Sequence, residues 1–245
     1  MTRPEPPWPG PDWPGAVASE WHRMEDAAQG RQLGGKRMSW DRPVTWEVRK
    51  RTELGKGHVS TFVDETIATP SGEVIARQYL THPGAVAVVC WDEKRDAIAV
   101  VRQYRHPVRY ELVEIPAGLL DMDGEDHVTA AQRELAEEAE LAAGRWNVLV
   151  DITTTPGACE ESLRIYLARD PRNTSRPDGF VLEGEEAHMR SEWVPREDLV
   201  AAVLAGQCQS PTLVAGTLAL ETARLSGRID QLRPANAPWP IRAGR

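Results

Sequence analysis

The feature that most constrains this chain is a short acidic stretch at residues 133–138, Arg-Glu-Leu-Ala-Glu-Glu. Read as a helix, it places Glu134, Glu137 and Glu138 at i, i+3 and i+4, on one arc roughly 100° wide. Like charges at this spacing repel each other, so helix formation alone does not favour them. Most glutamate runs are merely solvated helix faces, but clustered carboxylates on a rigid face also suit Mg²⁺ and substrate phosphates.

The residues around this stretch carry a longer pattern that favours the metal. Gly118 opens a loop, and Glu125 follows within it. The arrangement resembles the signature of the Nudix hydrolase superfamily, G-x5-E-x7-R-E-U-x-E-E-x-G-U, where U is aliphatic. The fixed positions of its E-x7-R-E-U-x-E-E part are all matched, by Glu125, Arg133, Glu134, Leu135, Glu137 and Glu138, and Leu141 follows as the final aliphatic residue. Chance does not readily match so many positions, so we prefer this interpretation to a solvated face.

Two departures from the signature concern the geometry of the loop and of the helix end. Six residues separate Gly118 from Glu125, where the family has five. Glu140 occupies the position of the family's second glycine, which supplies a left-handed backbone at the helix end. Either Glu140 adopts that conformation at a cost of about 1 kcal/mol, or the helix continues to Gly144. Neither departure removes a candidate metal ligand.

Composition limits the class of protein. The 245 residues are 41% hydrophobic and 27% charged, which is ordinary for one soluble domain with appendages. We expect no membrane segment and no secretory signal, because no apolar run approaches spanning length. Three scattered cysteines predict reduced thiols in the cytoplasm. The net charge of −8 argues against nucleic acid as a partner.

The ends of the chain differ from its middle. Residues 1–40 are rich in Pro, Gly and Trp, and we expect a disordered or loosely packed tail. A tryptophan-anchored partner motif and a natural start at Met38 are the alternatives there. Residues 41–82 alternate apolar and polar positions and predict a small β-rich part. Residues 231–245 are proline-rich and predict an irregular tail.

The middle, residues 83–230, predicts a mixed sheet covered by helices. Strands are expected at 84–93, 97–106, 110–118, 146–157 and 162–170, with a short edge strand at 191–195. Two amphipathic helices follow at 196–205 and 211–226, each with proline near its start and glycine near its end. The fold class is α/β, an α/β/α sandwich of the Nudix type preceded by the β-rich part.

Three further features resemble the ADP-ribose pyrophosphatase branch of the family, in its actinobacterial form. They are Gln103-Tyr104-Arg105 followed by Glu114-Ile115-Pro116-Ala117-Gly118, a proline fifteen residues beyond Leu141, and the β-rich part before the core. On physical grounds alone that proline, Pro156, is an ordinary turn residue, and Arg105 is equally well a surface cation. In this branch the β-rich part forms a dimer by exchanging strands, so the resemblance implies a homodimer.

The resemblance also implies roles for individual residues. The metal ligands would be Glu134, Glu137, Glu138 and the carbonyl oxygen of Ala117, and Gly118, Glu125 and Arg133 would be structural. The general base would come from a downstream acidic loop, with Glu186 preferred to Glu185. Arg105, Glu114 and a partner's Arg77 would bind substrate. Loop acids and strand arginines are more often only solvated, and the sequence keeps both options open for Glu185, Glu186 and Arg77.

The expected function is Mg²⁺-dependent hydrolysis of ADP-ribose to AMP and ribose 5-phosphate, with Mn²⁺ as a possible substitute. A small nucleoside diphosphate derivative would be the only partner besides a second copy of the chain. Two alternatives remain: a pyrophosphatase for UDP- or GDP-sugars, and a non-catalytic regulator that binds ADP-ribose. All carboxylates of the signature are present, which argues against the non-catalytic regulator.

Overall fold

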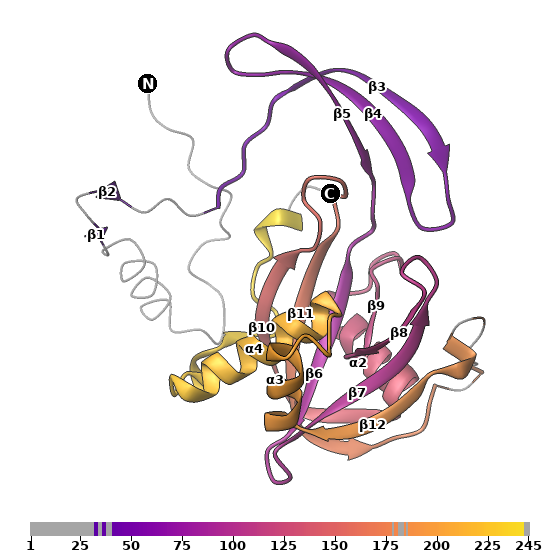
Figure 1. Ribbon diagram of the computed structural model, residues 1–245, viewed down its shortest axis with the longest axis vertical. Coiled ribbons are helices and arrows are strands. Elements are labelled where there is room, and N and C mark those ends of the chain that lie inside the picture. The colour runs from indigo at the N-terminus through magenta and orange to yellow at the C-terminus, as the bar shows by residue number, and fades with distance from the viewer. Residues whose placement is uncertain are drawn as a thin grey trace. The chain divides into compact units, whose positions relative to one another are not determined.

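The computed structural model in Figure 1 describes residues 32–33, 36–37, 41–177, 179–180, 184 and 186–242. The chain divides into two units, Met1–Thr45 and Trp46–Arg245. In the first unit, β1 (Gln32–Leu33) pairs antiparallel with β2 (Lys36–Arg37). The rest of the tail expected at residues 1–40 lies outside the described residues.

The second unit contains the predicted mixed sheet. Its strands lie in the order β12-β7-β6-β11-β10-β13, with β8 beside β7 and β9 beside β6. β11 runs parallel to β6, whereas the other pairs are antiparallel. The strands are β6 (Ala85–Asp92), β7 (Ala97–Arg105), β8 (Tyr110–Glu114), β9 (Ala117–Leu119), β10 (Leu141–Thr153), β11 (Ser162–Asn173), β12 (Arg190–Pro195) and β13 (Arg233–Pro234).

Helices cover both faces of this sheet, which confirms the predicted α/β/α sandwich (Figure 1). Successive residues of β6 point to opposite faces. Val86 and Val88 pack with helix α2 (His127–Ala139), whereas Ala87 and Val89 pack with α3 (Arg196–Leu204) and α4 (Pro211–Leu225). Burial on both sides explains why β6 reads as an uninterrupted apolar run.

Both ends of α2 have identifiable caps. The Asp126 side chain accepts a 3.0 Å hydrogen bond from the backbone N–H of Val128 and starts the helix. Glu140 ends it in the left-handed conformation, with φ 55° and ψ 39°. The first of the two expectations for Glu140 is therefore correct: the helix stops at Ala139 and does not continue to Gly144, which lies in β10.

The predicted β-rich part is a separate three-stranded antiparallel sheet of β3 (Glu47–Lys56), β4 (Thr61–Ala68) and β5 (Val74–Leu80). Its last strand connects directly to the main sheet. The backbone of Leu80 donates to Ala158 and accepts from Glu160, at 2.9 and 3.0 Å. The sheet is thereby hydrogen-bonded to the turn that precedes β11.

The segment predicted to be an irregular tail contains two short elements besides its loops. β13 pairs with β10, and a 3-10 helix, η3, spans Pro240–Arg242. Trp239, 7% exposed, packs edge-on against His127 and beneath the guanidinium of Arg164. Such packing was not visible in the proline-rich sequence. No helix among the described residues is long and apolar enough to span a membrane.

Candidate active site

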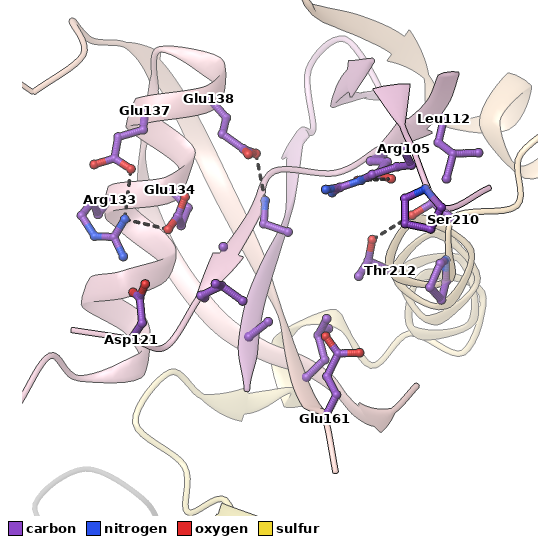
Figure 2. Close-up of a pocket in the computed structure, with 18 of the residues that line it drawn as sticks. Arg105, Leu112, Asp121, Arg133, Glu134, Glu137, Glu138, Glu161, Ser210 and Thr212 are labelled. Atoms are coloured by element: carbon purple, nitrogen blue, oxygen red, sulfur yellow. Dashed lines mark hydrogen bonds and ion pairs between the residues drawn. The ribbon is translucent and has the colours of Figure 1, made fainter. Parts of the chain in front are cut away.

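A cleft of about 580 Å³ lies between the N-terminal loop of α2, the end of β7 and the start of α4. Figure 2 shows its side chains in three groups. Glu134, Glu137 and Glu138 form one wall with Arg133. Arg105, Ser210 and Thr212 lie opposite, Glu161 lies between the two walls, and Asp121 lies on the α2 side below Arg133 and Glu134.

The three predicted metal-binding glutamates share one wall and are nearly buried. Glu134, Glu137 and Glu138 are 9%, 8% and 8% exposed. Burying a carboxylate without a compensating charge or hydrogen bonds is costly. Each of the three is therefore held by a polar contact, and this wall is called the carboxylate wall below.

Arg133 supplies the compensating cation within the chain. It donates from Nε and Nη2 to both oxygens of Glu125, each at 3.1 Å. Its Nη1 donates to Glu134 at 2.6 Å and to Glu137 at 3.0 Å. These carboxylates, Glu125 first, raise the pKa of the Arg133 guanidinium above its ordinary value. Glu125 and Arg133, both expected to be structural, form an ion pair that ties the long loop to the helix.

Strand β9, which precedes the loop before α2, contacts the same wall through its backbone. The N–H of Ala117 donates to the Glu138 carboxylate at 2.9 Å. A Cβ on Gly118 would overlap the Glu134 carboxyl group, so only glycine fits there without displacing it. The Ala117–Gly118 pair predicted from sequence thus lies directly against two of the glutamates.

The opposite wall contains a second ion pair. Arg105 donates to both oxygens of Glu114, from Nε at 3.0 Å and from Nη2 at 2.6 Å. Glu114 is buried, whereas 42% of the Arg105 side chain is exposed at the cleft. Ser210 and Thr212, which begin α4, lie beside this pair and bond each other at 3.1 Å. Backbone N–H groups at a helix start attract anions.

Sequence reasoning did not assign Glu161, which lies between the walls. It accepts a hydrogen bond from the Thr154 hydroxyl, and its other oxygen lies 3.6 Å from His82 Nε2. The one signal was its place five residues after Pro156, the proline that resembles the ADP-ribose pyrophosphatase branch. Asp121 and a set of apolar lining residues were also missed: Pro107, Val108, Leu112 and Phe180.

Three predicted residues are not placed at the cleft by the described structure. Arg77 lies in β5, exposed, and does not line the cleft. Glu185 lies outside the described residues. Glu186 begins the 3-10 helix η1 (Glu186–His188), which packs near β7, but its side chain is not described.

The donor set suits a hard divalent cation. Arg133 bonds Glu125, Glu134 and Glu137, and Glu138 lies beside them on the same wall, so carboxylate oxygens, the ligands that Mg²⁺ prefers, gather in one place. Among the described residues, no three acidic, histidine or cysteine side chains converge into a ready-made metal site. Glu134 and Glu137 instead turn to Arg133, and binding a cation would require them to reorient.

Comparisons with known proteins agree with this geometry. The model of the NUDIX domain matches residues 81–212. An ADP-ribose pyrophosphatase of Mycobacterium tuberculosis is 39% identical over 187 residues, which is 76% of this chain and 87% of that protein. An ADP-ribose pyrophosphatase of Bacillus subtilis is 33% identical over 120 residues, 49% of this chain and 64% of that protein.

A solved structure shares the fold. The crystal structure of an ADP compounds hydrolase superposes with a TM-score of 0.60 at 18% identity, covering 78% of this chain and all of that one. The matched NUDIX region includes both walls of the cleft. This chain therefore belongs to the Nudix hydrolases, in their ADP-ribose pyrophosphatase branch, and hydrolyses a nucleoside diphosphate derivative.

Proposed function

We propose that this enzyme hydrolyses ADP-ribose to AMP and ribose 5-phosphate with Mg²⁺. The observation that carries the proposal is a single cleft with buried carboxylates on one wall and Arg105 on the other. A diphosphate bridging a cation and an arginine fits this arrangement of charges. The similarity to the mycobacterial ADP-ribose pyrophosphatase supports the choice of substrate.

Glu134, Glu137, Glu138 and the Ala117 carbonyl oxygen would hold the metal. When bound, Mg²⁺ would offset the charge of the diphosphate and acidify a water molecule. Arg133 keeps Glu125, Glu134 and Glu137 together, so that the wall remains in place between catalytic cycles. Most of the catalytic effect would then come from positioning and charge stabilisation.

The opposite wall would bind the substrate. Glu114 holds the Arg105 guanidinium in a fixed plane. The exposed edge of that guanidinium would donate to a phosphate oxygen. The start of α4 lies beside it and would supply backbone N–H groups to the same phosphate. The apolar lining near Val108 and Leu112 is suited to a nucleobase.

Glu186 is our first candidate for the general base, with Glu185 as the second. The helix η1 that Glu186 begins packs near β7, whose last residue is Arg105. Glu186→Gln should lower kcat about a hundredfold and leave the affinity for Mg²⁺ nearly unchanged. A normal rate would move the base to Glu185, which the matching Glu185→Gln variant would reveal.

The deciding experiment is product analysis with ADP-ribose, UDP-glucose, GDP-mannose, NADH and a deoxynucleoside triphosphate, each with and without Mg²⁺. We expect metal-dependent release of AMP chiefly from ADP-ribose. Preference for a UDP- or GDP-sugar would agree with the proposed metal-dependent hydrolysis but reject ADP-ribose as the substrate. Tight binding of ADP-ribose without any turnover would instead favour the regulatory alternative.

We also propose a homodimer formed through the three-stranded sheet. Phe62 and Leu80 are register partners, and Val74 shares their face. All three are 40–46% exposed, so both ends of this face present large apolar side chains to solvent. A partner would cover this face. Arg77 lies on the opposite face of β5, so its proposed role at the partner's cleft rests on the family resemblance alone. Light scattering should give twice the chain mass, and Phe62→Glu should shift it toward the monomer.

The cytoplasm is our proposed location. Cys90, Cys159 and Cys208 are all free, and burial raises the pKa of the Cys90 thiol to about 12. A protein whose three cysteines are all unpaired is suited to a reducing compartment. Cell fractionation tests this placement, and recovery from the extracellular fraction would reject it.

A further inference from the structure

The C-terminal end of α2 is held by a residue from outside the helix. Its last turn contains no basic residue. Arg176, three residues beyond the end of β11, donates from Nε to the backbone carbonyl oxygen of Glu137 at 2.8 Å. Its Nη1 lies 2.5 Å from Glu140 Oε1. The N–H of Thr174 also donates to the Glu140 carbonyl oxygen, at 2.9 Å.

These contacts offset a local disadvantage in the sequence. The last carbonyl groups of a helix lack intrahelical partners and form the negative end of its dipole. Glu140 adds a negative charge there, in a left-handed conformation that costs a non-glycine residue roughly 1–2 kcal/mol. Arg176 bonds one of the carbonyl groups and neutralises the added charge. Arg176 thus stabilises a helix end that the family's glycine would stabilise without a side-chain contact.

The position of this contact connects it with the carboxylate wall. The carbonyl that Arg176 caps belongs to Glu137, and Glu138 is the next residue. Both side chains project from the last turn of α2 into the cleft. If that turn frays, the two carboxylates move with the backbone. A contact outside the cleft can therefore govern the geometry inside it.

We propose that Arg176 is a positioning residue, which clamps the last turn of α2 so that Glu137 and Glu138 stay oriented for a divalent cation. The need for this clamp follows from Glu140, which replaces the family's glycine. The proposal rests on the metal assignment made above. Arg176 is 34% exposed in its side chain, so its removal should leave the fold intact.

The clamp itself is tested by hydrogen exchange on the metal-free protein. In Arg176→Ala, the amides of residues 138–140 should exchange about tenfold faster than in the wild type, because the last turn opens more often. Arg172→Ala is the matched control, since Arg172 is an exposed arginine of β11 with no role in the clamp. Equal protection in Arg176→Ala and the wild type would overturn the proposal.

The effect of the clamp on cation affinity is tested by calorimetric titration with Mg²⁺ and with Mn²⁺. Arg176→Ala should weaken cation binding about tenfold, as loss of a residue that orients ligands typically does. Arg172→Ala should bind like the wild type. If the wild type binds cations and Arg176→Ala binds them equally well, the positioning role is wrong. If the wild type binds no cation, the metal assignment fails. Hydrogen exchange still tests whether Arg176 holds the last turn of α2.

Glu140→Gly separates the two tasks of Arg176. Alone, it should keep wild-type exchange and cation affinity, because glycine fits the left-handed conformation and the cap on Glu137 remains. In this background, Arg176→Ala should cost less affinity than it does beside Glu140. Losses of equal size in both backgrounds would overturn the part of the proposal that assigns Arg176 to compensating Glu140. Arg176→Gln, an uncharged donor, replaces the alanine variant if that variant melts early.

Discussion

The two walls of the cleft are built in different ways. The carboxylate wall comes from one continuous stretch, residues 117–138, in which helix periodicity and one loop bring the proposed metal ligands together. The opposite wall draws on β7, β8 and the start of α4, with Glu161 of the turn before β11 between them. The proposed metal site thus depends on local sequence, whereas the proposed substrate-binding wall is assembled by the fold.

This difference predicts how the two walls respond to mutation. Loss of a carboxylate should remove turnover with every substrate, because all of them share the diphosphate. Loss of a residue on the opposite wall should change KM, and to different extents for different substrates. The following predictions test that separation, beginning with the largest effect.

Glu138→Gln should lower kcat about a hundredfold or more with every substrate tested, because it removes a metal ligand. The amide oxygen can still accept the hydrogen bond from Ala117, so the fold should survive. Steady-state kinetics and circular dichroism measure both outcomes. The exposed Glu111→Gln, on β8, is the matched control. Near-normal turnover of Glu138→Gln would show that the metal assignment is wrong.

Arg105→Ala should raise KM for ADP-ribose about tenfold or more, which is the effect of losing one charge-assisted hydrogen bond. It also leaves Glu114 buried without its partner, which destabilises the fold. The double variant Arg105→Ala/Glu114→Gln removes that second effect. Thermal melting should recover in the double variant while KM stays high. If KM recovers as well, Arg105 only stabilises the wall.

Glu161→Gln should change KM a few-fold, by an amount that depends on the sugar. Its carboxylate faces the cleft and could accept hydrogen bonds from hydroxyl groups. Comparison of ADP-ribose with ADP-glucose measures this dependence. Equal changes with both substrates would assign Glu161 to the structure of the turn and remove it from recognition.

The smallest expected effect concerns the support of α2 by the C-terminal segment. Burial lowers the pKa of His127, and the nearby Arg164 and Arg242 lower it further. The folded state then binds a proton less readily than the unfolded state. Stability should therefore fall as the pH drops below about 6.5, the ordinary value, toward the pKa of the folded protein.

His127→Gln should flatten this dependence. Melting temperatures between pH 5 and pH 7.5 measure it, and the difference from the wild type isolates His127 from the other histidines. His58→Gln is the control, because His58 is exposed near the three-stranded sheet. A slope identical to that of the wild type would mean that the contact of His127 with Trp239 carries no proton linkage.

Much of the fold was predictable because its signals are local. The two helices after the sheet were expected at 196–205 and 211–226 and lie at Arg196–Leu204 and Pro211–Leu225. Proline starts and glycine ends mark such helices in the sequence. The edge strand at 191–195 was also correct. The docking of Trp239 was not predictable, because the residues that receive it are distant in sequence.

The sequence by itself determined the family, the carboxylate wall and the departure at Glu140, since each depends on spacing within one short segment. Only the tertiary structure decided that Glu140 takes the left-handed conformation and that Arg176 caps the same turn. It also decided that Glu161 and the start of α4 share a cleft with the glutamates. Spacing along one element is fixed by backbone geometry, whereas neighbours from different elements are set by packing of the whole sheet.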